Sequence, residues 1–470
     1  MRRHLSFSTL SLITSRISLI IVPLCWAIPS VHAQLTETPF PADTLSNIKI
    51  SLPAAPPEIP ETLFGSFLEP IGHSTYGGLW AQALENPSFE EGLWSLDHVS
   101  EMLREYPEYR RASELGIPLP WEPLDPHQGN RYLLVRGDAG NSNASLLIMS
   151  LPEKEVGVMQ EVYLPLHRNL TYNGSLMLKH VRGPNEVTIS LRRHSHPDQI
   201  LAKAVVSAAS DTWQTYAYTL TIAPHQVGHL EPVDLVVSLT DDARAQVDNV
   251  TLSPSDAVEG MDPDVLKLAK DLQSPVVRFG GNFTSAYHWR DGVGPVEHRV
   301  SMINSSWGIP EYNTFGTDEF LTFCKLIHAE PQIAPNLGTG TPKEAGEWVG
   351  YVNDHWSNGK GGLLWELGNE LWGDFQIGDP SQRRIAAVTL ATSQAVRAVD
   401  PHARLIATGG DEDFFHDWNA MQLANPKGTF DFLSTHFVVN DRVQLPNAPP
   451  DFSTMASLAL PWGLEGVMDL

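Results

Sequence analysis

The fold is decided by one stretch, Leu363-Leu364-Trp365-Glu366-Leu367-Gly368-Asn369-Glu370 (residues 363–370). A short, mostly apolar run that ends in glycine and polar residues is typical of a buried strand in a parallel sheet. Residues just after such strands lie at the carboxyl edge of the sheet, where barrel enzymes bind their ligands. The stretch therefore predicts that Asn369 and Glu370 lie at a functional site, with Trp365 and Leu367 as an apolar wall beside Glu370. The alternative interpretation is that Asn369 and Glu370 cap the next helix.

Apolar strands and amphipathic helices alternate on both sides of this stretch. Such alternation predicts a parallel sheet, and the number of repeats predicts a (β/α)₈ TIM barrel of the α/β class. Leu63–Leu68 supplies a first strand, which makes six strands, two fewer than a closed barrel. The other expected strands are Val276–Phe279, Gln332–Leu337, Leu363–Leu367, Leu405–Thr408 and Phe432–His436, and the expected helices include Pro263–Leu272, Thr317–Ile327, Pro342–Asn353 and Ser381–Val399.

Residues 92–255 have a different pattern. Short segments with period-two alternation follow one another, separated by turns such as Arg182-Gly183-Pro184-Asn185. This pattern predicts a β-sandwich, jelly-roll-like, inserted after the first barrel strand. The expected domains are therefore a signal peptide (1–33), an N-terminal linker with one strand (34–62), barrel strand 1 and a first helix read in Gly77–Phe89 (63–91), the inserted sandwich (92–255), and barrel strands 2–6 (256–470).

The N-terminus has the pattern of a secretory signal. Basic Met1-Arg2-Arg3 is followed by the apolar run Ile17–Ile28, which is shorter than the roughly 20 residues of a membrane-spanning helix. Val31-His32-Ala33 then provides the small residues of a cleavage site. We expect a secreted or periplasmic protein with no membrane contact after removal of residues 1–33; a membrane anchor is the alternative. Removal would leave Cys324, predicted to be a buried helix thiol, without a partner for an intrachain disulfide.

The charge balance excludes one class of partner. The chain has 31 lysines and arginines against 55 aspartates and glutamates in 470 residues, a formal net charge of 31 − 55 = −24. Because nucleic-acid binding needs a basic surface to neutralise phosphates, we expect no nucleic-acid partner. A neutral sugar is compatible with this charge.

Polar residues end the predicted barrel strands. Glycosidases need two carboxyl groups at such a place, one of them protonated near neutral pH, and Glu370 has the best strand context for this role. From the residues alone, alternatives remain for the others. Glu69 could cap a strand, Asn282 could serve a tight turn after two glycines, and His436 could be a structural histidine.

No metal cluster is expected at the barrel, and no cofactor is required. His194-Ser195-His196 has the spacing of a metal clip but lacks a third ligand, so it is interpreted as a solvated strand edge. Asp241, Asp242 and Asp248 are candidate oxygen ligands for a structural calcium ion in the sandwich.

Several segments, taken in serial order, resemble the family 51 glycoside hydrolases, which are mainly α-L-arabinofuranosidases. The resemblance covers about residues 63–90 and 256–470. It is carried by Phe64-Gly65-Ser66-Phe67-Leu68-Glu69, Gly77–Trp80, Asn86-Pro87-Ser88-Phe89-Glu90, Arg278-Phe279-Gly280-Gly281-Asn282-Phe283, Tyr287–Pro295, Gly316–Phe320, Asn336–Gly340 and Trp365–Gly378.

The resemblance implies a role for each matching residue. Glu370 looks like the acid/base on strand 4, and Asn369 like the residue that binds the sugar 2-hydroxyl. Glu69 and Asn282 look like hydroxyl ligands, and His436 matches a histidine near the nucleophile on strand 6. Val438 departs from the family, which usually has tyrosine there.

The family's nucleophile is a glutamate at the end of strand 7, and we expect it to be absent from this chain. Strand 6 ends at His436, and a helix expected over Thr454–Met468 follows. Glu465 lies within that helix and is not assigned as the nucleophile. The resemblance thus implies a chain truncated before strand 7, which as given would be inactive.

The predicted activity is retaining removal of terminal non-reducing α-L-arabinofuranosyl groups from arabinoxylan, arabinan or related oligosaccharides. Two other readings stay open. An endo-acting glucanase or xylanase on the same barrel would have an open cleft rather than a closed pocket. A non-catalytic carbohydrate-binding protein would use the sandwich as its binding element.

Overall fold

The computed structural model of the chain describes residues 60–356, 361–378, 381–410 and 415–436. The signal peptide, most of the 34–62 segment, Val438, Glu465 and the helix expected over Thr454–Met468 lie outside these ranges. None of the helices within them is both long and apolar enough to cross a membrane.

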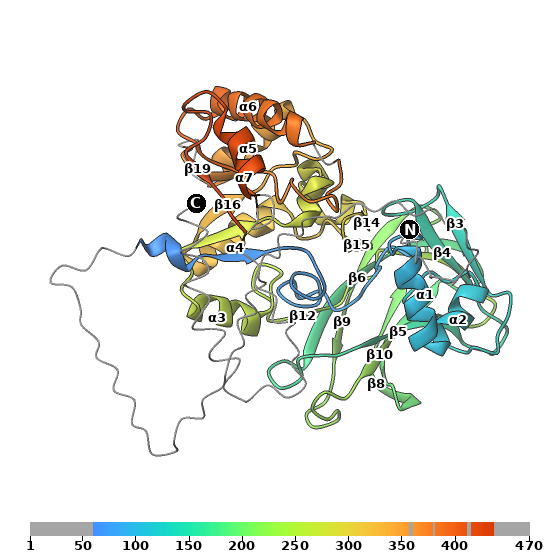
Figure 1. The fold of residues 1–470 in the computed structure, drawn as a ribbon. Coiled ribbons are helices and arrows are strands. Elements are labelled where there is room, and N and C mark those ends of the chain that lie inside the picture. The colour runs from blue at the N-terminus through green and yellow to red at the C-terminus, as the bar shows by residue number, and fades with distance from the viewer. Residues whose placement is uncertain (1–59, 357–360, 379–380, 411–414, 437–470) are drawn as a thin grey trace, which may run out of the picture. The chain divides into compact units, whose positions relative to one another are not determined.

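A parallel sheet of six strands forms the barrel part of the structure (Figure 1). Its strands are neighbours in the order in which they occur along the chain, as in the first six strands of a (β/α)₈ barrel. Every adjacent pair is parallel, so all six carboxyl ends meet at one edge. The strands are β1 (Ser66–Leu68), β13 (Val276–Phe279), β16 (Glu330–Ile333), β17 (Leu364–Leu367), β18 (Arg404–Ala407) and β19 (Phe432–Leu433).

Helices join these strands and cover the sheet. They are α3 (Pro263–Asp271), α4 (Thr317–Ile327), α5 (Pro342–Trp356), α6 (Gln382–Val399) and α7 (Phe415–Leu423). α3 begins where the Asp262 carboxylate accepts hydrogen bonds from two backbone N–H groups, with Pro263 at its first position. Cys324 on α4 is fully buried, as expected.

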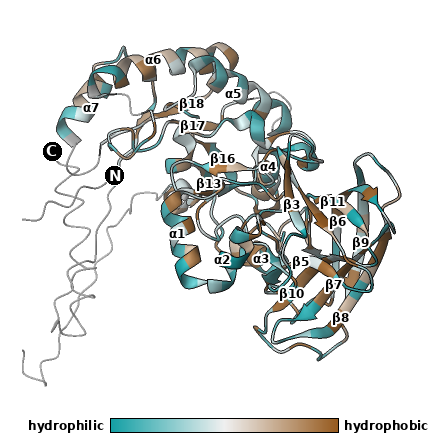
Figure 2. Cartoon of the chain, turned by 90° about the vertical axis from the view of Figure 1, so that its right-hand side faces the viewer, coloured by the Kyte–Doolittle hydropathy of each residue, from teal (hydrophilic) through white to brown (hydrophobic). Residues whose placement is uncertain are grey.

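Two antiparallel sheets form the inserted β-sandwich. One sheet contains β2 (Glu122–Pro123), β5 (Val156–Val162), β10 (Val233–Leu239), β7 (Glu186–Arg193) and β8 (His196–Ser207). The other contains β12 (Ser253–Pro254), β6 (Thr171–Arg182), β11 (Arg244–Asp248), β4 (Ala144–Met149) and β3 (Tyr132–Arg136), with β9 (Gln214–Thr221) paired to β6. Two helices precede them, α1 (Leu96–Glu105) and α2 (Pro107–Glu114). Figure 2 shows hydrophobic residues along the strands of both parts, where they form the two cores.

Two local predictions were wrong. No helix forms in Gly77–Phe89, which consists of turns and isolated bridges that link Tyr76, Trp80 and Met261. Gly77, Asn86 and Phe89 have positive φ angles, which an α-helix does not allow. The start of the expected strand Leu63–Leu68 is a 3₁₀ helix, η1 (Glu61–Phe64), so β1 begins only at Ser66.

Short elements fill the loop between β13 and α4. They are the 3₁₀ helices η2 (Asn282–Ser285), η3 (Trp289–Gly292) and η4 (Val296–His298) and the hairpin of β14 (Met302–Asn304) and β15 (Ile309–Glu311). Asn141 of the sandwich donates from Nδ2 to the carbonyl groups of Glu297 (2.7 Å) and Arg299 (3.0 Å) in this loop. The loop is therefore tied to the sandwich by direct hydrogen bonds.

Candidate active site

Glu370 lies just beyond the carboxyl end of β17, as predicted. Its φ angle is +42°, in the left-handed region that non-glycine residues rarely adopt, and Gly368 before it is also left-handed, with φ +90°. The Glu370 carbonyl accepts a hydrogen bond from Gly373 N–H at 2.9 Å, which helps to hold this conformation. No helix begins here, so the helix-cap alternative does not describe the residue. Strained residues of this kind gather at functional sites.

His436, which follows the sixth strand β19, lies next to Glu370. Its Nδ1 is 2.8 Å from Glu370 Oε1, and its Nε2 is 3.7 Å from Glu366 Oε1. Hydrogen bonds to the carboxylates of Glu366 and Glu370 raise the pKa of His436 to about 9, although burial opposes this shift. The imidazole is therefore a cation at neutral pH and donates a hydrogen bond to Glu370.

Glu366 is a buried carboxylate inside β17 that the sequence analysis did not assign. Its side chain is 2% exposed, and it accepts hydrogen bonds from Arg278 Nε and from Gln332 Nε2 at 3.2 Å. Burial by itself would raise the pKa of Glu366, but Arg278 and His436 outweigh it and lower the pKa to about 2. Glu366 is therefore ionised and held in place between two cations.

A chain of amides continues from this ion pair. Arg278 Nη2 donates to Asn369 Oδ1 (2.6 Å), and Asn369 Nδ2 donates to Asn282 Oδ1 (2.8 Å). Asn282 Oδ1 also accepts from Gln376 Nε2 (2.6 Å), whose amide oxygen in turn accepts from Ser285 Oγ (2.6 Å). The donors and acceptors define the orientation of each amide, so Asn282 and Asn369 are held rigidly beside Glu370.

Glu69 follows β1 and is largely buried, at 7% exposure. Its Oε1 accepts from Trp307 Nε1 (2.6 Å) and from Phe283 N–H (3.2 Å), next to Asn282. Burial raises the pKa of Glu69, although these hydrogen bonds oppose the shift. Gly281, at φ +113°, allows the approach, since a Cβ there would lie 2.1 Å from Glu69 Cδ.

The structure thus gathers all five predicted residues at the carboxyl ends of β1, β13, β17 and β19. Sequence reasoning missed the residues that connect them: Arg278, Glu366, Gln376 and Trp307. The signal for Arg278 and Glu366 was present in the sequence, because a charged residue inside an apolar strand needs a buried partner.

The prediction that Trp365 and Leu367 form an apolar wall beside Glu370 was wrong. Both side chains are fully buried in the hydrophobic core between the parallel sheet and its helices. Trp365 packs edge-to-face on Trp348 of α5, with ring centres 6.0 Å apart.

The inner face of the sheet borders a cavity of about 400 Å³. Inward-facing side chains of β16, β17 and β18 line it, and it reaches His436. Arg278 and Glu366 both lie on its wall, so their ion pair is part of the lining of this cavity.

The candidate calcium ligands do not gather. Asp248 is buried and its carboxylate accepts hydrogen bonds from the backbone N–H groups of Gly140, Asn141 and Asn249, at 2.7–2.8 Å. Across the described ranges, no group of three or more histidine, cysteine, aspartate or glutamate side chains has the arrangement of a metal site. His194 bonds to Asp234 at 2.8 Å.

The titration of His436 predicts how stability depends on pH. Because its folded pKa lies above the ordinary 6.5, the stabilisation it provides is complete below about pH 6.5 and is lost as the pH rises through about 9. We expect His436→Gln to unfold at a lower temperature than the wild type at pH 6, with a gap that closes above pH 9. Thermal unfolding of both proteins across this range measures the gap. A gap that does not change with pH would show that His436 is neutral in the folded protein.

The chain is similar to known proteins over part of its length. Residues 268–355 match the family model described as "Alpha-L-arabinofuranosidase 1 domain". A probable α-L-arabinofuranosidase C of Aspergillus clavatus is 35% identical over 219 residues, which cover 42% of this chain and 43% of the relative. Over these segments the chain is similar to α-L-arabinofuranosidases. An intracellular exo-α-(1→5)-L-arabinofuranosidase 1 of Bacillus subtilis is 36% identical over 207 residues, covering 40% of this chain and 41% of the relative.

A solved structure of the family supports the fold. The arabinose-bound α-L-arabinofuranosidase MgGH51 superimposes with a TM-score of 0.58 at 18% sequence identity, covering 78% of this chain and 61% of that one. The likeness extends beyond the segments that align by sequence, and it shows that the six parallel strands belong to a TIM-barrel fold. The chain spans less than half the length of the curated relatives that it matches.

Proposed function

We propose that the whole protein is a retaining α-L-arabinofuranosidase that removes terminal non-reducing arabinofuranosyl groups from arabinoxylan, arabinan or their oligosaccharides. The observation that carries this proposal is the setting of Glu370. Its carboxyl group stands at the carboxyl end of the fourth strand, hydrogen-bonded to the cationic His436. Asn369 directly precedes it in the chain and donates a hydrogen bond to Asn282 (2.8 Å). Acid/base catalysis by a carboxyl group requires no metal or cofactor.

In this proposal Glu370 acts twice. It first takes up a proton, which the adjacent His436 imidazolium can supply, and gives it to the glycosidic oxygen as the bond to the sugar carbon breaks. A carboxylate nucleophile about 5 Å away forms a bond to that carbon at the same time. It then takes a proton from the water that hydrolyses the sugar–enzyme bond. Asn369, Asn282 and Glu69 bind the hydroxyl groups of the sugar, since each presents amide or carboxylate atoms at the same edge of the sheet.

The nucleophile is not assigned among the residues that the structure describes. Glu366 is the carboxylate that reaches Glu370 through His436, but it is buried inside the strand and paired with Arg278. A carboxylate stabilised in this way is a poor nucleophile, because attack would leave Arg278 without its partner. We therefore give Glu366 a positioning role: it holds Arg278 and His436, which in turn orient Asn369 and Glu370.

The protein at its natural full length provides the test. We expect it to release 4-nitrophenol from the α-L-arabinofuranoside and not from the β-D-xylopyranoside or β-D-glucopyranoside. Proton NMR of the first product should show the same anomer as the substrate, as retention requires. Shortening of xylan without release of arabinose would favour the endo-acting alternative. Binding of these polymers without hydrolysis would favour the non-catalytic alternative.

We also propose that the protein is secreted or periplasmic, on the support of the basic and apolar pattern of residues 1–33. Its substrates, plant polysaccharides, are too large to enter cells. The N-terminal sequence of the protein recovered from the medium or periplasm should then begin near Gln34, and an uncleaved N-terminus would contradict this assignment.

A further inference from the structure

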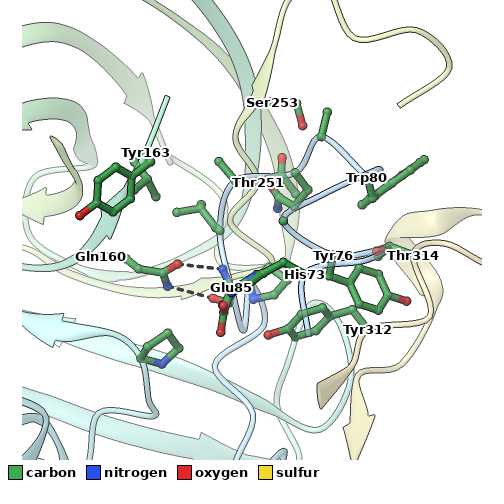
Figure 3. Close-up of a pocket in the computed structure, with 18 of the residues that line it drawn as sticks. His73, Tyr76, Trp80, Glu85, Gln160, Tyr163, Thr251, Ser253, Tyr312 and Thr314 are labelled. Atoms are coloured by element: carbon green, nitrogen blue, oxygen red, sulfur yellow. Dashed lines mark hydrogen bonds between the residues drawn. The ribbon is translucent and has the colours of Figure 1, made fainter. Parts of the chain in front are cut away.

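A cavity of about 780 Å³ lies away from the network of Glu370 (Figure 3). Its walls come from the segment after β1, from α1 and α2, from the end of β5, and from the loops around Thr251 and Tyr312. It shares no residue with the hydrogen-bonded network of Glu370. The volume falls within the range of roughly 300–1,000 Å³ in which proteins bind small ligands.

Aromatic rings form much of its lining. Tyr76 and Tyr312 pack edge-to-face with ring centres 5.1 Å apart, and both hydroxyl groups are tied, Tyr76 to Glu311 and Tyr312 to the N–H of Asn86 (3.0 Å). Two other tyrosines of the lining are exposed: Tyr106 is 47% and Tyr163 is 60% exposed. The inner rings are therefore held in place, and the outer two have faces open to solvent.

Glu85 places a carboxylate without a hydrogen-bond donor in this cavity, with His73 as its electrostatic neighbour. The side-chain amide of Gln160 on β5 makes two hydrogen bonds to the backbone of Glu85 (Figure 3). Its Oε1 accepts from the Glu85 N–H (2.8 Å), and its Nε2 donates to the Glu85 carbonyl (2.9 Å). No residue in the described ranges hydrogen-bonds to the Glu85 carboxylate, which is half-buried. Burial raises its pKa. A shielded carboxylate without a donor is a group that a ligand can satisfy.

The charge of the lining restricts the ligand. Glu85, Glu161, Asp262 and Glu297 contribute acidic groups, and the described residues that line the cavity include no lysine or arginine. Phosphates and uronic acids fit this balance poorly, because His73 is the one basic side chain among the described lining residues and it already interacts with Glu85. Fixed and exposed tyrosines with carboxylate and amide acceptors suit an uncharged ligand that has both apolar C–H faces and many hydroxyl donors.

We infer that this cavity is a second binding site, which takes a segment of a neutral oligosaccharide chain. Tyr106 and Tyr163 stack on sugar rings at the entrance, and Glu85 accepts hydrogen bonds from hydroxyl groups inside. The assignment of this oligosaccharide to the polymer that the enzyme hydrolyses rests on the proposed function. The site would hold the polymer while Glu370 acts on its side groups, so affinity for polymer would exceed affinity for a single arabinose unit.

The test separates binding from hydrolysis. All variants are made in a Glu370→Ala background of the full-length protein, and affinity is measured for soluble arabinoxylan by native affinity electrophoresis and for xylohexaose by calorimetry. Glu85→Gln keeps the size of the side chain and removes its charge, and Tyr163→Ala removes an exposed ring. Each should weaken binding by about tenfold, the effect of losing one charged hydrogen bond or one anchor ring.

Two exposed residues of the sandwich serve as matched controls. Glu186→Gln on β7 removes a charge and Leu133→Ala on β3 removes an exposed apolar side chain, and neither residue lines the cavity. Both should bind as tightly as the parent. Unchanged unfolding temperatures in all four variants exclude a loss of fold.

The outcomes distinguish this inference from the proposed function. If Glu85→Gln and Tyr163→Ala lose affinity while the wild type hydrolyses no arabinofuranoside, the cavity is confirmed and the proposed function fails. Equal affinity in parent and variants, or no binding of either glycan by the parent, overturns the inference. Binding of tetramethylammonium that depends on Glu85, without binding of glycans, also overturns it, because the cavity would then be a cation site.

Discussion

Glu370→Ala, made in the natural full-length protein, should lower kcat for unactivated arabinofuranosides by roughly 10²–10⁴-fold, the contribution typical of a general acid/base. Substrates with good leaving groups, such as the 2,4-dinitrophenyl arabinofuranoside, should lose less in the first step, because their oxygen needs little protonation. Added azide should restore turnover, since a small anion can attack the sugar–enzyme intermediate without a base. Steady-state rates for a series of aryl arabinofuranosides, with and without azide, measure all three effects.

Glu101→Ala is the control for this substitution. Glu101 is an exposed glutamate on α1 that pairs with Arg104 on the same helix, and its loss should leave every rate unchanged. An equal fall for good and poor leaving groups, with no effect of azide, would remove Glu370 from the acid/base role. It would not affect the fold assignment, which rests on the strand order and on the solved relative.

Arg278→Met should be the most destabilising single change in the barrel. Arg278 is 14% and Glu366 is 2% exposed, so the substitution leaves a buried carboxylate without its main cation. Breaking one side of a buried ion pair costs roughly 3–5 kcal/mol. His436, at 3.7 Å from Glu366, offsets only part of the loss. Urea unfolding monitored by tryptophan fluorescence gives the change in the free energy of unfolding.

The double variant Arg278→Met/Glu366→Leu distinguishes the effect of an unpaired buried charge from the effect of losing the shape of the arginine side chain. Removing both charges should recover much of the lost stability, because a buried pair replaced by apolar residues is often neutral. Activity should stay low, since Asn369 loses the donor that orients it. A double variant as unstable as Arg278→Met would contradict the ion-pair explanation and indicate that the shape of the arginine side chain matters instead.

Both parallel-sheet and sandwich segments could be predicted from the sequence because their patterns are local. The runs that became β13, β17 and β18 are short and apolar, and the sandwich strands alternate with period two. The failure at Gly77–Phe89 has a non-local cause. Helix-compatible residues such as Ala81, Ala83 and Leu84 lie there between glycines and Pro87, but long-range contacts hold the segment in turns. Ala81 N–H donates to Gly260 at 2.9 Å and Ala83 N–H to Leu252 at 2.8 Å.

The sequence by itself determined which residues reach the carboxyl edge of the sheet. Glu69, Asn282, Asn369, Glu370 and His436 each follow a strand, and in a parallel sheet the covalent order alone brings such residues to one edge. Only the tertiary structure decided what they do there. Arg278 and Glu366 are 88 positions apart, and Gln160 and Glu85 are 75 apart. These partners meet because parallel register and sandwich packing bring distant segments together, and burial then requires each charge and amide to find the one neighbour within hydrogen-bond distance.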